Sequence, residues 1–155
     1  MWLVAAVVFC LDSCIKTYLR LYFAYQSIPV IRNIFHITVI FNKGAAFGIL
    51  QKSGTLLVYI GILFLLIFSV FIKKEKKKNL LFLISCGMIL GGAFSNLWDR
   101  IFLGFVVDYI DLRVWPVFNL SDSCITVGVA LLILEPYLGG FRKEHAPLNS
   151  KAKQT

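Results

Sequence analysis

Charged residues are scarce in this chain. They make up 15% of its 155 residues, whereas 59% are hydrophobic, and the mean hydropathy is +0.80. A soluble domain carries about 25% charged residues, so this chain lacks the charge that would cover a folded surface in water. The composition therefore predicts a membrane protein, and a chain of this length is expected to form one domain.

Residues typical of metal and redox sites are also few. The two histidines, His36 and His145, are far apart, and no cysteine pair has CxxC spacing. The four cysteines all lie in apolar surroundings: Cys10, Cys14, Cys86 and Cys124. Such cysteines are usually buried small hydrophobic residues, so neither a metal site, a disulfide nor a cofactor is predicted.

The formal net charge is +8, and nine of the sixteen cations lie in two places. Five lysines lie within Lys73–Lys78, between two apolar runs, and four more cations follow Gly140. Cationic clusters beside membrane spans are what the positive-inside rule describes. A nucleic-acid partner is therefore not predicted, and both cationic segments are expected on the cytoplasmic side.

The apolar runs are continuous, which favours helices over the alternating strands of a membrane barrel. Four transmembrane helices are predicted at about residues 2–23, 54–72, 79–98 and 121–138. The first is expected to be a retained span, because MWLVAAVVFC lacks the basic start and the cleavage pattern of a signal peptide. In the third, Gly87, Gly91 and Ser95 form a small-residue face for close helix packing.

This topology predicts one domain over residues 1–140, a basic cytoplasmic tail over 141–155, and both termini inside. Residues 24–53 and 100–120 then lie on the outer face. The sequence IFHITVIFN from Ile34 predicts short strands there, and Gly44 and Gly48 mark turns or close backbone approaches. The expected fold class is an all-α membrane protein with a small extracytoplasmic β-containing segment.

Five of the eight carboxylates lie in or beside the predicted spans: Asp12, Asp99, Asp108, Asp111 and Asp122. An ionisable group at membrane depth costs about 2.5–3.5 kcal/mol, which makes it a candidate for function. Three of the five have a cation nearby in the sequence: Lys16 follows Asp12, Arg100 follows Asp99, and Arg113 follows Asp111. A structural or orienting role is expected for Asp12 and Lys16, and a polar patch is expected for Asp99 with Gly92 and Asn96.

Asp108 and Asp122 have no cation within four residues. Two carboxylates held close together share one proton, so that one serves as general base and the other as general acid. The spacing permits this pairing without establishing it. Two other classes stay open on these grounds: a proton-coupled four-helix exporter, and a lipid-binding or assembly protein without catalysis. An exporter needs neither a thirty-residue outer segment nor two solitary aspartates.

Five short motifs, in order from about Leu11 to Leu138, resemble those of the lipoprotein signal peptidases (signal peptidase II). They are LDSCIK for D-x-x-x-K, FNKGAAFGIL for N-x-G-A-A-F, GGAFSNLWDR for G-G-x-x-x-N-x-x-D-R, VVDYID for V-V-D-F and FNLSDSCITVG for F-N-x-A-D-S. The resemblance implies that Asp108 and Asp122 are the catalytic pair. The substrate-binding or supporting residues would be Asp12, Lys16, Asn42, Gly44, Gly92, Asn96, Asp99, Arg100, Asn119 and Ser121.

One departure from the family pattern lies beside the implied catalytic pair. Ser121 replaces the usual alanine, and its hydroxyl is expected either to bond the pair or to cap the helix. The resemblance further implies an aspartyl endopeptidase in the bacterial cytoplasmic membrane, active as a monomer among membrane lipids, with its site toward the outer face. Its substrates would be prolipoproteins carrying a diacylglyceryl group, cleaved just before the modified cysteine without a metal.

Overall fold

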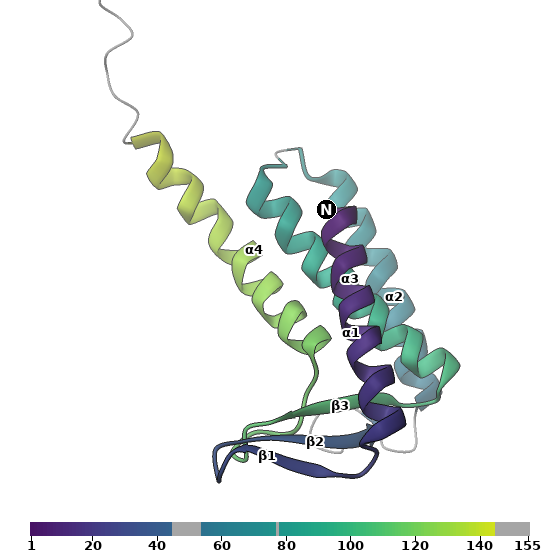
Figure 1. The fold of residues 1–155 in the computed structure, drawn as a ribbon. Coiled ribbons are helices and arrows are strands. Elements are labelled where there is room, and N and C mark those ends of the chain that lie inside the picture. The colour runs from purple at the N-terminus through teal and green to yellow at the C-terminus, as the bar shows by residue number, and fades with distance from the viewer. Residues whose placement is uncertain (45–53, 77, 145–155) are drawn as a thin grey trace, which may run out of the picture.

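Four helices and a three-stranded sheet make up the computed structural model, which describes residues 1–44, 54–76 and 78–144 (Figure 1). In chain order the elements are α1 (Trp2–Tyr22), β1 (Ser27–Ile31), β2 (Phe35–Asn42), α2 (Gly54–Lys74), α3 (Leu80–Phe102), β3 (Val106–Asp111) and α4 (Leu120–Glu144). Each helix is long and apolar enough to cross a membrane. The predicted fold class is confirmed.

Three helices extend beyond their predicted ends, α2 by two residues and the other two by more. Helix α3 continues to Phe102, so Asp99 and Arg100 belong to its last turns. Helix α4 continues to Glu144, so residues 141–144 are helical, although the tail was expected to begin there. The predicted turn at Gly48 lies outside the described residues.

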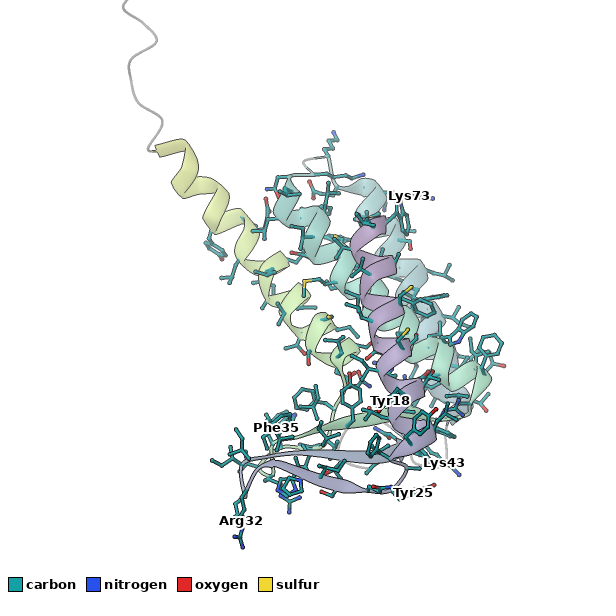
Figure 2. All side chains as sticks on the ribbon, in the orientation of Figure 1. Tyr18, Tyr25, Arg32, Phe35, Lys43 and Lys73 are labelled. Carbon is teal, nitrogen blue, oxygen red and sulfur yellow. The ribbon has the colours of Figure 1, made fainter. Side chains whose placement is uncertain are left out.

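The sheet lies across one end of the helices, here called the sheet end (Figure 1). The N-terminus and the α2–α3 connection lie at the opposite end. In Figure 2, Lys73 is at that opposite end, whereas Arg32 and Lys43 are on the sheet. The lysine-rich connection and the sheet are therefore at opposite ends of the bundle.

Helix α3 is approached closely by α1 and α4. A Cβ at Gly91 would lie 2.5 Å from the Ala5 carbonyl oxygen of α1, and a Cβ at Gly92 would lie 2.6 Å from the Ser121 carbonyl oxygen of α4. Neither position has room for a side chain. The predicted small-residue face is thus confirmed against α1, and Gly92 lets the first turn of α4 pack on α3.

The strands are antiparallel in the order β1-β2-β3. A buried apolar cluster of Leu19, Val39, Val107 and Tyr109 joins the sheet to the end of α1. The Tyr109 hydroxyl also accepts a hydrogen bond from the Leu120 backbone N–H at 3.2 Å. Strand β3 is therefore fixed both to α1 and to the start of α4.

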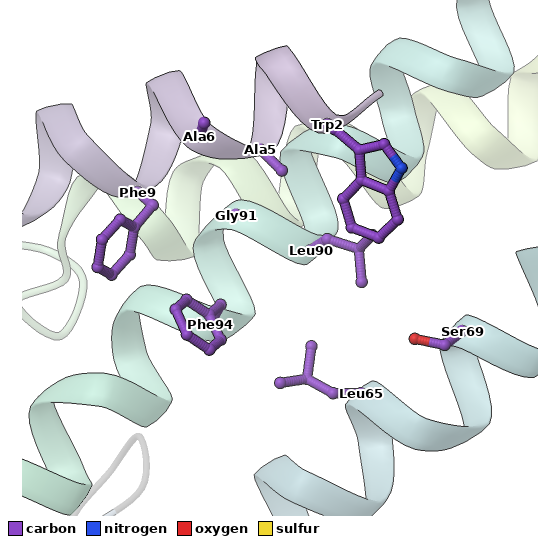
Figure 3. A pocket seen from close by; sticks show the side chains of 9 residues that line it. All are labelled: Trp2, Ala5, Ala6, Phe9, Leu65, Ser69, Leu90, Gly91 and Phe94. Atoms are coloured by element: carbon purple, nitrogen blue, oxygen red, sulfur yellow. The ribbon is translucent and has the colours of Figure 1, made fainter.

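A cavity of about 420 Å³ opens between α1, α2 and α3 (Figure 3). Apolar side chains, including those of Trp2, Phe9, Leu65 and Phe94, dominate its lining, and Ser69 contributes the one hydroxyl among the lining residues. No ionisable side chain lines it. The buried carboxylates Asp99, Asp108 and Asp111 lie instead toward the sheet end.

Candidate functional site

Helix α4 begins with a reciprocal pair of hydrogen bonds. The Asn119 side-chain oxygen accepts from the Asp122 backbone N–H at 2.9 Å, and an Asp122 carboxylate oxygen accepts from the Asn119 backbone N–H at 3.3 Å. This is a capping box, in which two N–H groups without helical partners are satisfied. The box fixes the Asp122 carboxylate at the positive end of the helix dipole, where negative charge is favoured.

Asp108 comes from β3 and is 2% exposed. Its two oxygens accept from the side-chain amides of Asn42, at 2.8 Å, and Asn119, at 2.7 Å. Asn119 therefore bonds both carboxylates, one through its side chain and the other through its backbone. The structure brings Asp108 and Asp122 together at one asparagine.

The surroundings of Asp108 favour its protonated form. Burial raises the pKa of Asp108 to about 6, and the charge of Asp122 acts in the same direction. The hydrogen bonds from Asn42 and Asn119 oppose this rise in pKa, because an amide donor stabilises the ionised carboxylate.

Asn42 is itself oriented by the backbone that follows it. The Gly44 N–H donates to the Asn42 side-chain oxygen at 3.0 Å. With its oxygen held in this way, the amide nitrogen of Asn42 is directed at Asp108. Gly44 thus acts on the site through its backbone.

Asn96 of α3 connects the two carboxylates to a buried cation. Its amide nitrogen donates to Asp122 at 2.8 Å, and its oxygen accepts from Asn119 at 3.1 Å. The same oxygen accepts from the Lys16 ammonium of α1 at 2.8 Å. The Lys16 charge thereby polarises the amide that donates to Asp122.

Lys16 also pairs with two carboxylates, Asp12 at 2.6 Å and Asp99 at 3.1 Å. The expected Asp12–Lys16 pair is confirmed, and both side chains are buried. Among the described residues, the cation that pairs with Asp99 is Lys16, not the adjacent Arg100. Neighbouring residues on a helix do not face each other, and Arg100 donates instead to the Asn96 carbonyl oxygen at 3.2 Å.

Both expectations for the Ser121 hydroxyl are wrong. It donates to an Asp12 carboxylate oxygen at 2.6 Å, and so neither bonds the carboxylate pair nor caps α4. The Ser121 backbone N–H donates to the other Asp12 oxygen at 3.1 Å. Asn119 makes the cap instead.

Asp111 lies in a separate group on the sheet. It accepts from Thr38 at 2.7 Å and pairs with Arg113 at 3.0 Å, as its sequence neighbourhood indicated. Burial alone would raise the pKa of Asp111, but the bonds from Thr38 and Arg113 outweigh it and hold that pKa below its ordinary value. An ionised, paired carboxylate of this kind is unsuited to sharing a proton.

Sequence reasoning missed one polar partner of the network. The Ser95 hydroxyl donates to Asp12 at 2.6 Å, whereas the sequence predicts for Ser95 only a small residue for helix packing. The same position serves both purposes, because α1 approaches α3 closely enough there for a hydroxyl to reach Asp12. No periodicity in the sequence distinguishes the two roles.

The fold and this network define a class: a multi-pass membrane protein in which a buried carboxylate, Asp108, and a partly buried one, Asp122, are joined at the sheet end. The sequence model of one family, described as "Signal peptidase (SPase) II", matches residues 4–138. The chain is 42% identical over 134 residues to the lipoprotein signal peptidase of Halothermothrix orenii, with 86% of this chain and 92% of that protein covered. It is 39% identical over 137 residues to that of Desulfitobacterium hafniense, covering 86% and 89%.

A solved structure described as a bacterial membrane enzyme superposes with a TM-score of 0.78 at 32% identity, covering 99% of this chain and 92% of that one. A second has a TM-score of 0.77 at 33% identity, covering 86% and 90%. The chain belongs to the signal peptidase II family and is therefore a peptidase. Membership in this family argues against the exporter and the lipid-binding alternatives.

Proposed function

We propose that the protein is an aspartyl endopeptidase that removes signal peptides from diacylglyceryl-modified prolipoproteins, cleaving just before the lipidated cysteine. The names of its relatives support the substrate class. The observation that carries the aspartyl mechanism is the shared asparagine: Asn119 bonds Asp108 and Asp122 at once. The catalytic pair is Asp108 and Asp122.

The two carboxylates have unequal surroundings, which assigns their roles. Asp122 is at a helix N-terminus and accepts from Asn96, whose oxygen bonds Lys16; these contacts stabilise its ionised form, in which it acts as general base. Asp108, with its pKa raised to about 6, acts as general acid in its protonated form.

The reaction then needs only this pair of carboxyl groups, the one proton they hold, and one water. Asp122 removes a proton from the water as its oxygen attacks the scissile carbonyl carbon, and Asp108 gives its proton to the carbonyl oxygen. Asp122 next protonates the leaving amine while Asp108 recovers the proton from the tetrahedral intermediate. The C–N bond breaks, and the pair returns to its starting state.

The placement of the site suits a substrate held by acyl chains. The positive-inside rule puts the lysine-rich connection and both termini in the cytoplasm, so the sheet end is toward the outer face of the cytoplasmic membrane. A lipid-anchored precursor presents its scissile bond at that height. One chain supplies every residue of the network, from α1, β2, α3, β3 and α4, which supports a monomer.

The test is cleavage of a lipidated precursor by the purified protein in detergent, monitored as a shift of the precursor band on a gel. Asp108→Asn and Asp122→Asn should each abolish cleavage, because an amide neither accepts nor donates the shared proton. Asn at 122 retains an oxygen for the Asn119 N–H, so folding is preserved. Residues that act as a unit are strongly non-additive, and the double variant should be no worse than either single one.

Asp111→Asn is the matched control, since it removes a nearby carboxylate from outside the pair. The Asp111→Asn variant should retain most of the wild-type rate of cleavage. A chelator should leave the wild-type rate unchanged. Substantial turnover by either of the two catalytic variants contradicts the assignment of the pair, and loss of activity on chelation contradicts the aspartyl mechanism.

A further inference from the structure

Helix α4 depends on other elements for the N–H groups of its first turn. These groups have no partners inside a helix. The Leu120 N–H donates to the Tyr109 hydroxyl of β3, and the Asp122 N–H donates to the Asn119 side chain. The Ser121 N–H donates to Asp12 of α1. The direction in which Asp122 points is therefore set partly by a residue of the first helix.

Ser121 donates a hydrogen bond to each of the two carboxylate oxygens of Asp12. Its N–H bonds one oxygen at 3.1 Å and its hydroxyl bonds the other at 2.6 Å, and both residues are fully buried. Hydrogen bonds to an ionised acceptor are stronger than neutral ones. Asp12 is also held by Lys16 and Ser95, so it offers a fixed carboxylate to which Ser121 attaches the start of α4 at two points instead of one.

We propose that Ser121 is a positioning residue: through its two-point contact with Asp12 it fixes the first turn of α4 and so the adjacent Asp122 carboxylate. The inference rests on the proposed function, because Asp122 is the group positioned. Alanine at this position, usual in the family pattern, keeps the backbone bond and lacks the hydroxyl bond. This chain thus has an additional constraint on its catalytic aspartate.

Ser95 offers a matched control, since its hydroxyl donates to the same Asp12 oxygen at the same 2.6 Å and is equally buried. Ser95, however, is inside α3 (Leu80–Phe102), where the helix's own backbone bonds hold its position. Ser95→Ala and Ser121→Ala should therefore lower the Tm by similar amounts. Only the serine in the first turn of α4 should affect the placement of Asp122.

The experiment measures kcat, KM and Tm for both variants with a lipidated precursor in detergent. Ser121→Ala should lower kcat about twofold to tenfold, the range that one net hydrogen bond corresponds to, with KM unchanged. Ser95→Ala should lower kcat less. Because Ser121 acts through Asp12, adding Ser121→Ala to an Asp12→Asn variant should change kcat less than it does in the wild type.

Equal kcat losses in the two serine variants, or a Ser121→Ala effect of full size on the Asp12→Asn background, would overturn the inference while leaving the peptidase assignment intact. An unchanged kcat in Ser121→Ala would do the same. Absence of cleavage by the wild-type protein would overturn the proposed function, and the positioning role with it.

Discussion

The pH dependence of cleavage should respond to the amide of Asn42. Its nitrogen donates to Asp108 at 2.8 Å, and this bond lowers the pKa of Asp108 against the effect of burial. Asp108 must be protonated to act as general acid, so kcat/KM should fall as the pH rises through the pKa of about 6. Asn42→Ala removes a donor that favours the ionised form, so the fall should move to higher pH.

The size of this movement follows from the bond that is lost. A hydrogen bond to a charged group contributes about 1.5–3 kcal/mol, and one pKa unit corresponds to about 1.36 kcal/mol. Water replaces part of the interaction, so the fall in kcat/KM at higher pH (the alkaline limb of the pH profile) should move by roughly one pH unit. The assay is kcat/KM against pH with a lipidated precursor, which reports the pKa values of the free enzyme.

Thr38→Val is the control for this experiment. Thr38 is on the same strand and also donates to a carboxylate, Asp111, at 2.7 Å. Its loss should leave the alkaline limb in place, because Asp111 is outside the catalytic pair. A limb that stays fixed in Asn42→Ala, or that moves to lower pH, would refute the assignment of Asp108 as the protonated member.

Three further results are expected. Asp12→Asn should lower stability in detergent by about 3 kcal/mol, near the lower end for breaking a buried pair, because Lys16 keeps its second carboxylate partner; unchanged stability in thermal melts would contradict this. Asp111→Asn should lower the stability of the protein above about pH 4, where the ionised Asp111 carboxylate is stabilised by its partners, and should not raise it at any pH. Thermal melts from pH 3 to 8 test this sign. In intact cells, a lone cysteine at Arg32 should react with an impermeant thiol reagent and one at Lys76 should not, and reversed labelling would invert the topology.

The helices were predictable because their signal is local. In helix α2 (Gly54–Lys74), the residues before Lys73 include no charged side chain, and no tertiary information is needed to assign such a run. The strand β2 was predictable from its β-branched and aromatic residues. The predicted ends were less accurate, since α3 and α4 both continue past them. In α3 the charged residue Asp99 is helical because it is buried and paired with Lys16 of α1.

The partners of buried charges were predictable only when they lay one turn apart. Asp12 and Lys16 met this condition, and their pair was foreseen. Asp99 joined the same lysine across two helices, and sequence adjacency to Arg100 gave the wrong partner. Likewise, the Ser121 hydroxyl reaches Asp12 only because α4 begins beside α1, a fact of tertiary packing that the local sequence does not contain.

The division of the polar network between the first and last spans has a consequence for biosynthesis. Asp12 enters the membrane with α1, whereas Asn119 and Asp122 arrive with α4. A nascent chain with three spans inserted carries Asp108 without its partner carboxylate and without the asparagine that joins the two. On the proposed assignment of the catalytic pair, cleavage is therefore expected only once the fourth helix is in place.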